Sequence, residues 1–126
     1  MSHLSNESEL AAFVREHIRS VWAVELLLLL KGDPDRTWAA GDLVRELRAS
    51  TLVVNSTLQR FERSGLALQE EGELWRYAPA SEVLGELADR LEAAYRERPV
   101  AVINLIATPP DPIQGLADAF KFRGDK

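Results

Sequence analysis

The chain has 126 residues, a net charge of −5 and no cysteine; 46% of its residues are hydrophobic and 28% are charged. This composition is typical of a globular protein, and the length suits one domain, or one small domain with added oligomerising helices. The lack of cysteine excludes disulfides, thiolate nucleophiles and cysteine-based zinc sites.

The N-terminal segment predicts a helix that follows a short frayed end, Met1–Ser5. Asn6 with Glu9 three residues later fits a capping box, which opens a helix. The apolar positions of this helix are Leu10, Phe13, Val14, Ile18 and Val21. The segment lacks a basic flank followed by an apolar core, so we expect no signal peptide and a location in the cytoplasm.

Residues 21–30 form an apolar run that ends in five leucines. The run is about half as long as a membrane span and contains Glu25, so we expect no membrane segment. Because the leucines are apolar on all sides, they predict a central, buried helix, and the pattern leaves open whether it continues from the preceding helix. Lys31 suits the helix C-terminus electrostatically, and Gly32-Asp33-Pro34 ends the helix.

Two further helices are predicted on either side of a tight turn. Thr37 is the expected cap before the first, and the apolar period covers Asp42–Ala49. Ser50 is the expected N-cap of the second helix, Thr51–Ser64. Gly65 then ends that helix, because glycine tolerates the left-handed conformation found just past a helix end.

A hairpin follows. Leu66–Glu70 and Glu73–Ala78 alternate like strands, and Glu71-Gly72 fits a two-residue turn between them.

The order helix, turn, helix, hairpin resembles a winged helix-turn-helix domain of the kind found in bacterial transcription regulators of the MarR and PadR groups. The resemblance spans roughly residues 18 to 95. The residues that carry it are Trp38–Leu43, Arg45–Leu47, Val54, Leu58, Phe61, Gly65, Leu66 and Trp75–Tyr77. It implies a mainly α fold with a small β-hairpin wing and added terminal helices. We expect an N-terminal tail and helix over 1–17, the winged domain over 18–80, and a helical extension over 81–126.

The extension is helical by pattern. Ser81 is the expected cap of a helix to about Arg98, with a narrow apolar stripe suited to pairing with another helix: Leu84, Leu87, Leu91 and Ala94. Pro99 suits the first position of a further helix, which is apolar through Ala107 except at Asn104. Pro109-Pro110 breaks that helix, and Asp111-Pro112 begins a last one that runs through Phe120.

The apolar surface of the helices at 81–98 and 99–107 predicts a homodimer, unless the last helix folds back and covers the stripe within one chain.

The helix at 51–64 is the candidate DNA-reading element. Val54, Leu58 and Phe61 lie within a narrow arc that faces the core. The other side carries side chains suited to base edges and phosphates, and Arg76 of the return strand suits a phosphate: Asn55, Ser56, Gln59, Arg60, Arg63 and Arg76. Segment 36–63 carries a charge of +2, which leaves −7 on the rest of the chain. The alternative is that this is an ordinary solvated helix face.

Two features favour a protein partner instead of DNA. Leu52 and Val53 point outward at the start of the same helix, where they could contact thymine methyl groups or another protein. The hairpin tip carries Glu70, Glu71 and Glu73, although a wing that follows phosphates normally has Arg or Lys there.

The remaining chemistry is sparse. Five aromatic residues either line a small-molecule pocket or, as we favour, pack the junction of helices and wing: Trp22, Trp38, Trp75, Tyr77 and Tyr95. The two histidines, His3 and His17, form no metal pair or catalytic triad, and Asn104 suits a polar contact better than a catalytic amide. We therefore expect no enzyme, metal or cofactor.

Two functions remain: a dimeric regulator that binds double-stranded DNA, or a winged-helix interaction module for another protein.

Overall fold

The computed structural model describes residues 2–107, and its side chains from Glu9 onward. Over this range the chain is mainly helical with a small antiparallel sheet, which confirms the expected fold class. The elements are α1 Ser2–His17, α2 Val21–Gly32, β1 Trp38–Ala39, α3 Ala40–Leu47, α4 Thr51–Ser64, β2 Ala67–Glu70, β3 Leu74–Tyr77, α5 Glu82–Glu97 and α6 Pro99–Ala107.

The first helix begins before the capping box that was predicted to open it. α1 already starts at Ser2, so the prediction of a frayed Met1–Ser5 and a cap at Asn6 was wrong. Neither glycine nor proline interrupts this segment, and Asn6 is accommodated inside the helix. The continuity that the pattern left open is also settled: α1 ends at His17, and Ser20 caps α2 by accepting a hydrogen bond from the Ala23 N–H at 3.1 Å.

The leucine-rich helix α2 lies at the centre of the core, as predicted. Its buried side chains are Ala23, Val24, Leu26, Leu27 and Leu30. They join one continuous apolar cluster to which all the other helices and the sheet contribute.

A strand precedes α3 that the sequence did not reveal. Thr37 was expected to cap the helix, but the chain forms β1, and Ala39 stands at the N-cap with no side-chain hydrogen bond. β1 pairs antiparallel with β3, so the buried Trp38 lies opposite the buried Trp75. A two-residue strand has no readable period and is defined only by its partner.

The start of α4 matches its prediction, but α3 spans Ala40–Leu47 instead of the predicted Asp42–Ala49, so residues 48–50 form the turn. Ser50 accepts a hydrogen bond from the Val53 N–H at 3.1 Å, and α4 spans the predicted residues. Gly65 then adopts a left-handed φ of 81°. Arg48 closes α3 with a φ of 57°, a conformation uncommon for a residue with a side chain.

The hairpin differs from its prediction in the turn. Glu70 pairs with Leu74, so the loop is Glu71-Gly72-Glu73, three residues instead of two. Gly72 and Glu73 both have positive φ values, 75° and 60°. β3 is the middle strand, in the order β1-β3-β2.

The extension forms α5 and α6 as predicted, with Ser81 capping α5 and Pro99 opening α6. The apolar stripe of α5 packs inside its own chain: Leu91 is fully buried, and Leu84 and Leu87 lie half-buried against the core. The core and α1 thus cover much of the stripe within one chain, while Leu84 and Leu87 stay partly exposed. The expected helix after Pro110 lies outside the described residues.

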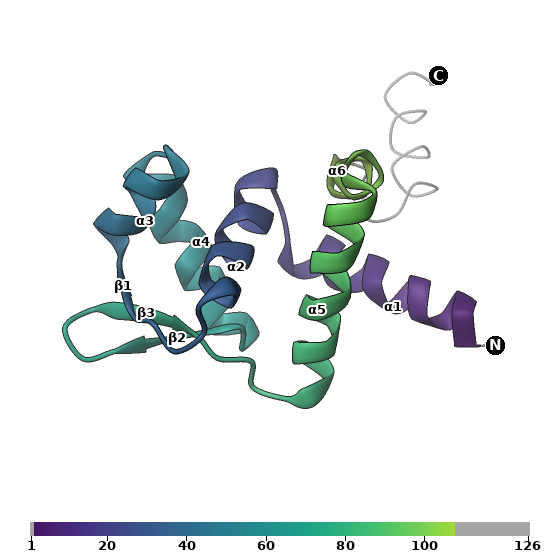
Figure 1. Cartoon of the computed structure of the whole chain (residues 1–126), viewed down its shortest axis with the longest axis horizontal. Coiled ribbons are helices and arrows are strands. Elements are labelled where there is room, and N and C mark those ends of the chain that lie inside the picture. The colour runs from purple at the N-terminus through teal and green to yellow at the C-terminus, as the bar shows by residue number, and fades with distance from the viewer. Residues whose placement is uncertain (1, 108–126) are drawn as a thin grey trace, which may run out of the picture.

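These elements give the molecule two distinct ends (Figure 1). The helix α3 and the β2–β3 hairpin lie at one end, and α1, α5 and α6 lie at the other, with α2 and α4 between them.

Polar contacts join α2 to α5 across the middle. The Tyr95 hydroxyl donates to Glu25 Oε2 at 2.7 Å, and Lys31 Nζ contacts Asp89 at 2.8 Å and Glu92 at 2.5 Å. Burial alone lowers the pKa of Lys31, but the two carboxylates outweigh it, so the pKa lies above its ordinary 10.5. The bond to Glu25 raises the pKa of Tyr95 above 10.0.

The first prediction concerns Gly65. A Cβ at this position would stand 3.0 Å from the Ala80 Cβ and 3.3 Å from Leu84 Cδ1, in addition to the strained φ. Gly72 has a similar φ but open space around it, so it is a matched control. We expect Gly72→Ala to lower the free energy of unfolding by about 1–2 kcal/mol and Gly65→Ala to lower it further, measured by urea denaturation. Equal losses at the two sites would contradict the close packing of Gly65.

The second prediction concerns alkaline pH. Folding raises the pKa of both Lys31 and Tyr95, so the stability they contribute is complete below pH 10.0 and is lost as the pH rises through their folded values. We expect the melting temperature to fall above this pH. Tyr95→Phe should cost about 1 kcal/mol at neutral pH and should make the alkaline fall shallower. An unchanged alkaline slope in the variant would contradict the role assigned to the Tyr95–Glu25 contact.

Candidate nucleic-acid interface

The exposed side of α4 is a ridge of side chains that the core holds in place. Val54, Leu58 and Phe61 are buried on the inner side, as the sequence predicted. With these positions fixed, the helical period turns one row of side chains outward: Leu52, Ser56, Gln59 and Arg63.

The predicted α4 site residues share this outer side, although not equally. Asn55, Ser56, Gln59 and Arg63 are exposed, whereas Arg60 is half-buried at the edge. The Ser56 hydroxyl donates to the Val53 carbonyl at 3.3 Å, so its proton is used within the helix and its oxygen remains an acceptor. The outer side of α4 therefore offers two amides, a hydroxyl acceptor and one exposed guanidinium.

Arg76, the predicted site residue on the hairpin, is itself engaged in an ion pair. Its Nε donates to Glu70 Oε2 at 2.8 Å across the hairpin, which neutralises the cation that was predicted to reach a phosphate. Glu71 and Glu73 at the tip are exposed. The wing therefore presents negative charge to its surroundings.

The five arginines between residues 36 and 63 differ in their availability. Arg45 forms an ion pair with Asp42 one turn away, and the Arg36 guanidinium lies 3.5 Å from the centre of the Trp38 ring. Within residues 9–107, Arg48, Arg60 and Arg63 have no acidic partner within salt-bridge distance.

Arg48 is the residue that the sequence interpretation did not single out. It is exposed in the turn directly before α4 and has a left-handed backbone. The sequence interpretation placed it inside the predicted helix 42–49, whereas α3 ends at Leu47.

Leu52 and Val53 at the start of α4 expose less apolar surface than predicted. Leu52 is 78% exposed, but Val53 is half-buried and so does not point fully outward. A single exposed leucine is ordinary on a protein surface and does not make an apolar patch by itself.

A contact from α1 fixes the far end of α4. His17 Nδ1 lies 2.8 Å from the Ser64 hydroxyl, and the Phe13 ring packs beside His17 with 5.5 Å between ring centres. With the Ser50 cap at the other end, α4 is anchored at both termini.

The aromatic residues divide between packing and exposure. Trp38 and Trp75 are buried against the core, as the packing interpretation predicted, and Tyr77 packs on the same cluster. Tyr95 also packs against this cluster and hydrogen-bonds to Glu25, while Trp22 is 41% exposed. Among the described residues, no group of three or more His, Asp or Glu side chains is placed to hold a metal ion.

Comparison of the chain with models of known protein families, with curated proteins and with solved structures found no match. No helix within residues 2–107 is long and apolar enough to cross a membrane.

Proposed function

We propose that the protein is a cytoplasmic, DNA-binding transcriptional regulator that reads the major groove with the outer side of α4. The observation that carries the proposal is the polar ridge of α4, which stands on a buried stripe and is anchored at both ends. Amide and guanidinium groups on a rigid helix are the side chains that read base edges. The element order around α4 is the one that the winged helix-turn-helix resemblance implies.

The net charge of −5 does not exclude this function, because binding depends on the local charge that faces the phosphates. Arg48 at the start of α4 and Arg60 and Arg63 near its end are cations without described acidic partners, on the element that would enter the groove. Phosphate contacts from both ends of a helix set its register on the duplex.

A second copy would pair through the outer face of α6. Val102 on the inner face is buried, whereas Val100 is 68% exposed and Ile103 36% exposed on the outer face. Exposed apolar side chains on one face of a short helix suit an isologous, two-fold contact. Because α6 lies at the opposite end from α3 and the hairpin, such a dimer leaves both reading helices accessible (Figure 1).

The third prediction tests DNA reading. In a shift assay with the DNA upstream of the protein's own gene, the double variant Arg60→Ala, Arg63→Ala should bind more weakly than the wild type. The loss of an arginine that contacts a base lowers the binding free energy by about 1–3 kcal/mol. The variant should also discriminate less between this DNA and an unrelated duplex, and the salt dependence should become less steep.

Arg96→Ala is the matched control, because Arg96 is an exposed arginine on α5 at the other end of the molecule. It should bind DNA as the wild type does. Light scattering of all three proteins should give twice the chain mass of 14.1 kDa. Tight binding by the double variant at physiological salt would remove Arg60 and Arg63 from recognition, and a 14.1 kDa species would exclude the dimer.

The second candidate function is a winged-helix module that binds another protein. The acidic tip of the wing favours it, since Glu71 and Glu73 would face DNA phosphates with like charge while Glu70 occupies Arg76. The exposed Leu52 adds an apolar contact for such a partner.

The fourth prediction separates the two functions. Glu71→Lys with Glu73→Lys changes only exposed side chains, so folding should be nearly unaffected. If the wing approaches DNA, non-specific affinity and its salt dependence should both increase, because added cations release counterions. No change in DNA affinity would place the wing away from DNA and favour the protein-binding module.

A further inference from the structure

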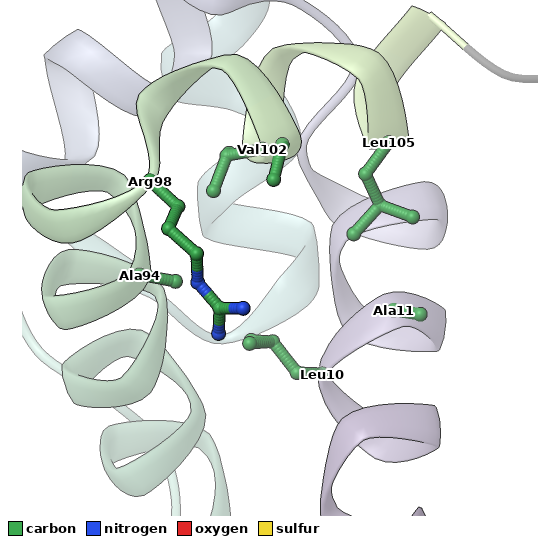
Figure 2. Close-up of a pocket in the computed structure, with 7 residues that line it drawn as sticks. Leu10, Ala11, Ala94, Arg98, Val102 and Leu105 are labelled. Carbon is green, nitrogen blue, oxygen red and sulfur yellow. The ribbon is translucent and has the colours of Figure 1, made fainter.

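A groove runs between α1 and the α5–α6 corner (Figure 2). These three helices form the end of the molecule away from the hairpin (Figure 1). Its volume is about 280 Å³, and it is lined by Leu10, Ala11, Ala94, Arg98, Ala101, Val102 and Leu105. Six of these seven residues are apolar. Three of them, Ala101, Val102 and Leu105, belong to α6, so this face of α6 differs from the outer face that carries Val100 and Ile103.

One cation crosses the apolar floor. Figure 2 shows the Arg98 side chain extending from the α5–α6 junction over the groove, with its guanidinium beside Leu10. In the described part of the chain, no carboxylate lies within salt-bridge distance of Arg98. A guanidinium above apolar side chains suits an occupant that is apolar on the face it packs and negatively charged overall.

The groove has a volume at the small end of ligand pockets, which usually measure about 300–1,000 Å³ and enclose most of the ligand. A row of side chains from a helix needs only a shallow apolar channel.

The chain itself continues from this place. The described residues end at Ala107, two positions after Leu105 of the groove, and 19 residues follow in the sequence. Among these, Ile113, Leu116, Ala117 and Phe120 recur at the spacing of one helix face. Residues 108–120 also contain two acidic residues, Asp111 and Asp118, and no Lys or Arg.

We propose that the α1–α5–α6 groove is the docking site for the C-terminal segment 111–120 of the same chain. The apolar face of this segment packs on Leu10, Val102 and their neighbours, and the net charge of −2 on residues 111–120 attracts the Arg98 guanidinium over the groove. The sequence Pro109-Pro110 predicts a break between α6 and this segment, because proline interrupts a helix.

Attachment favours this occupant over a separate molecule. Residues 108–112 span at most about 17 Å when extended, so the segment is held close to a groove that α6 itself lines. A short tether gives an effective concentration in the millimolar range, and a modest apolar contact then suffices. A second copy would instead meet the exposed Val100 and Ile103 on the outer face of α6.

Cysteine cross-linking of the full chain tests the docking. The protein has no cysteine, so an introduced pair is the only pair present. Ala11→Cys with Ala117→Cys joins the groove to the segment. Ala12→Cys with Ala117→Cys is the matched control, because Ala12 is the next residue of α1 and lines other surface hollows.

With a short bis-maleimide, we expect roughly tenfold more intrachain product from the Ala11 pair than from the Ala12 pair, identified by intact mass and peptide mapping. Arg98→Glu in the Ala11 pair should reduce that product, and Arg98→Lys should retain it. Equal yields from the two pairs would overturn the proposal. Product that joins two chains would overturn it as well, by assigning the groove to a second copy. These measurements use no DNA, so they stand or fall independently of the proposed function.

Discussion

The fold depends on the burial of α2. Leu26, Leu27 and Leu30 are removed from water together with Val24, and each such side chain contributes about 1.5–3 kcal/mol. An apolar helix needs cover, and beyond the exposed Val21 and Trp22 at its start it obtains that cover from α3, α4, β3 and the rest of the core cluster. The positions of α3, α4 and the sheet are therefore tied to the covering of one helix.

The same requirement produces the candidate interface. α4 can contribute Val54, Leu58 and Phe61 to this core only by turning its remaining residues outward. Its caps at Ser50 and Gly65 and the His17–Ser64 contact hold those outer side chains in one orientation. The polar ridge thus follows from the packing of the apolar stripe on the opposite side of the same helix. Any amphipathic helix has such a ridge, so its function depends on its side chains and not on the fold.

Charge placement matters more here than net charge. The acidic excess is spread over α5 and the wing, where Lys31 draws Asp89 and Glu92 together and Arg76 engages Glu70. The α4 region keeps Arg48, Arg60 and Arg63 without described acidic partners. At the opposite end, α6 carries two different faces, one apolar and exposed, the other forming a groove crossed by Arg98. Assembly and recognition can therefore use separate ends of the molecule.

The sequence by itself determined the elements whose signals are local. Helix caps at Ser50 and Ser81, the left-handed Gly65, the buried stripe of α4 and the centrality of the leucine run all depend on neighbouring residues, and the structure has each of them. The exposure of Asn55, Ser56, Gln59 and Arg63 followed from the same helical period. The start of α1 was the exception, since a capping pattern at Asn6 was present but the helix extended past it.

Tertiary structure alone decided the features that need a distant partner. β1 exists because β3 lies beside it, and the pairing of Glu70 with Leu74 made the hairpin loop three residues long. Glu70 engaged Arg76 because the hairpin brought two residues six positions apart onto one face. The apolar stripe of α5 was predicted to pack against another helix. Only the tertiary structure shows that this helix is α1 of the same chain, together with the core. Periodicity states which side of an element is apolar; it carries no information about which surface covers that side.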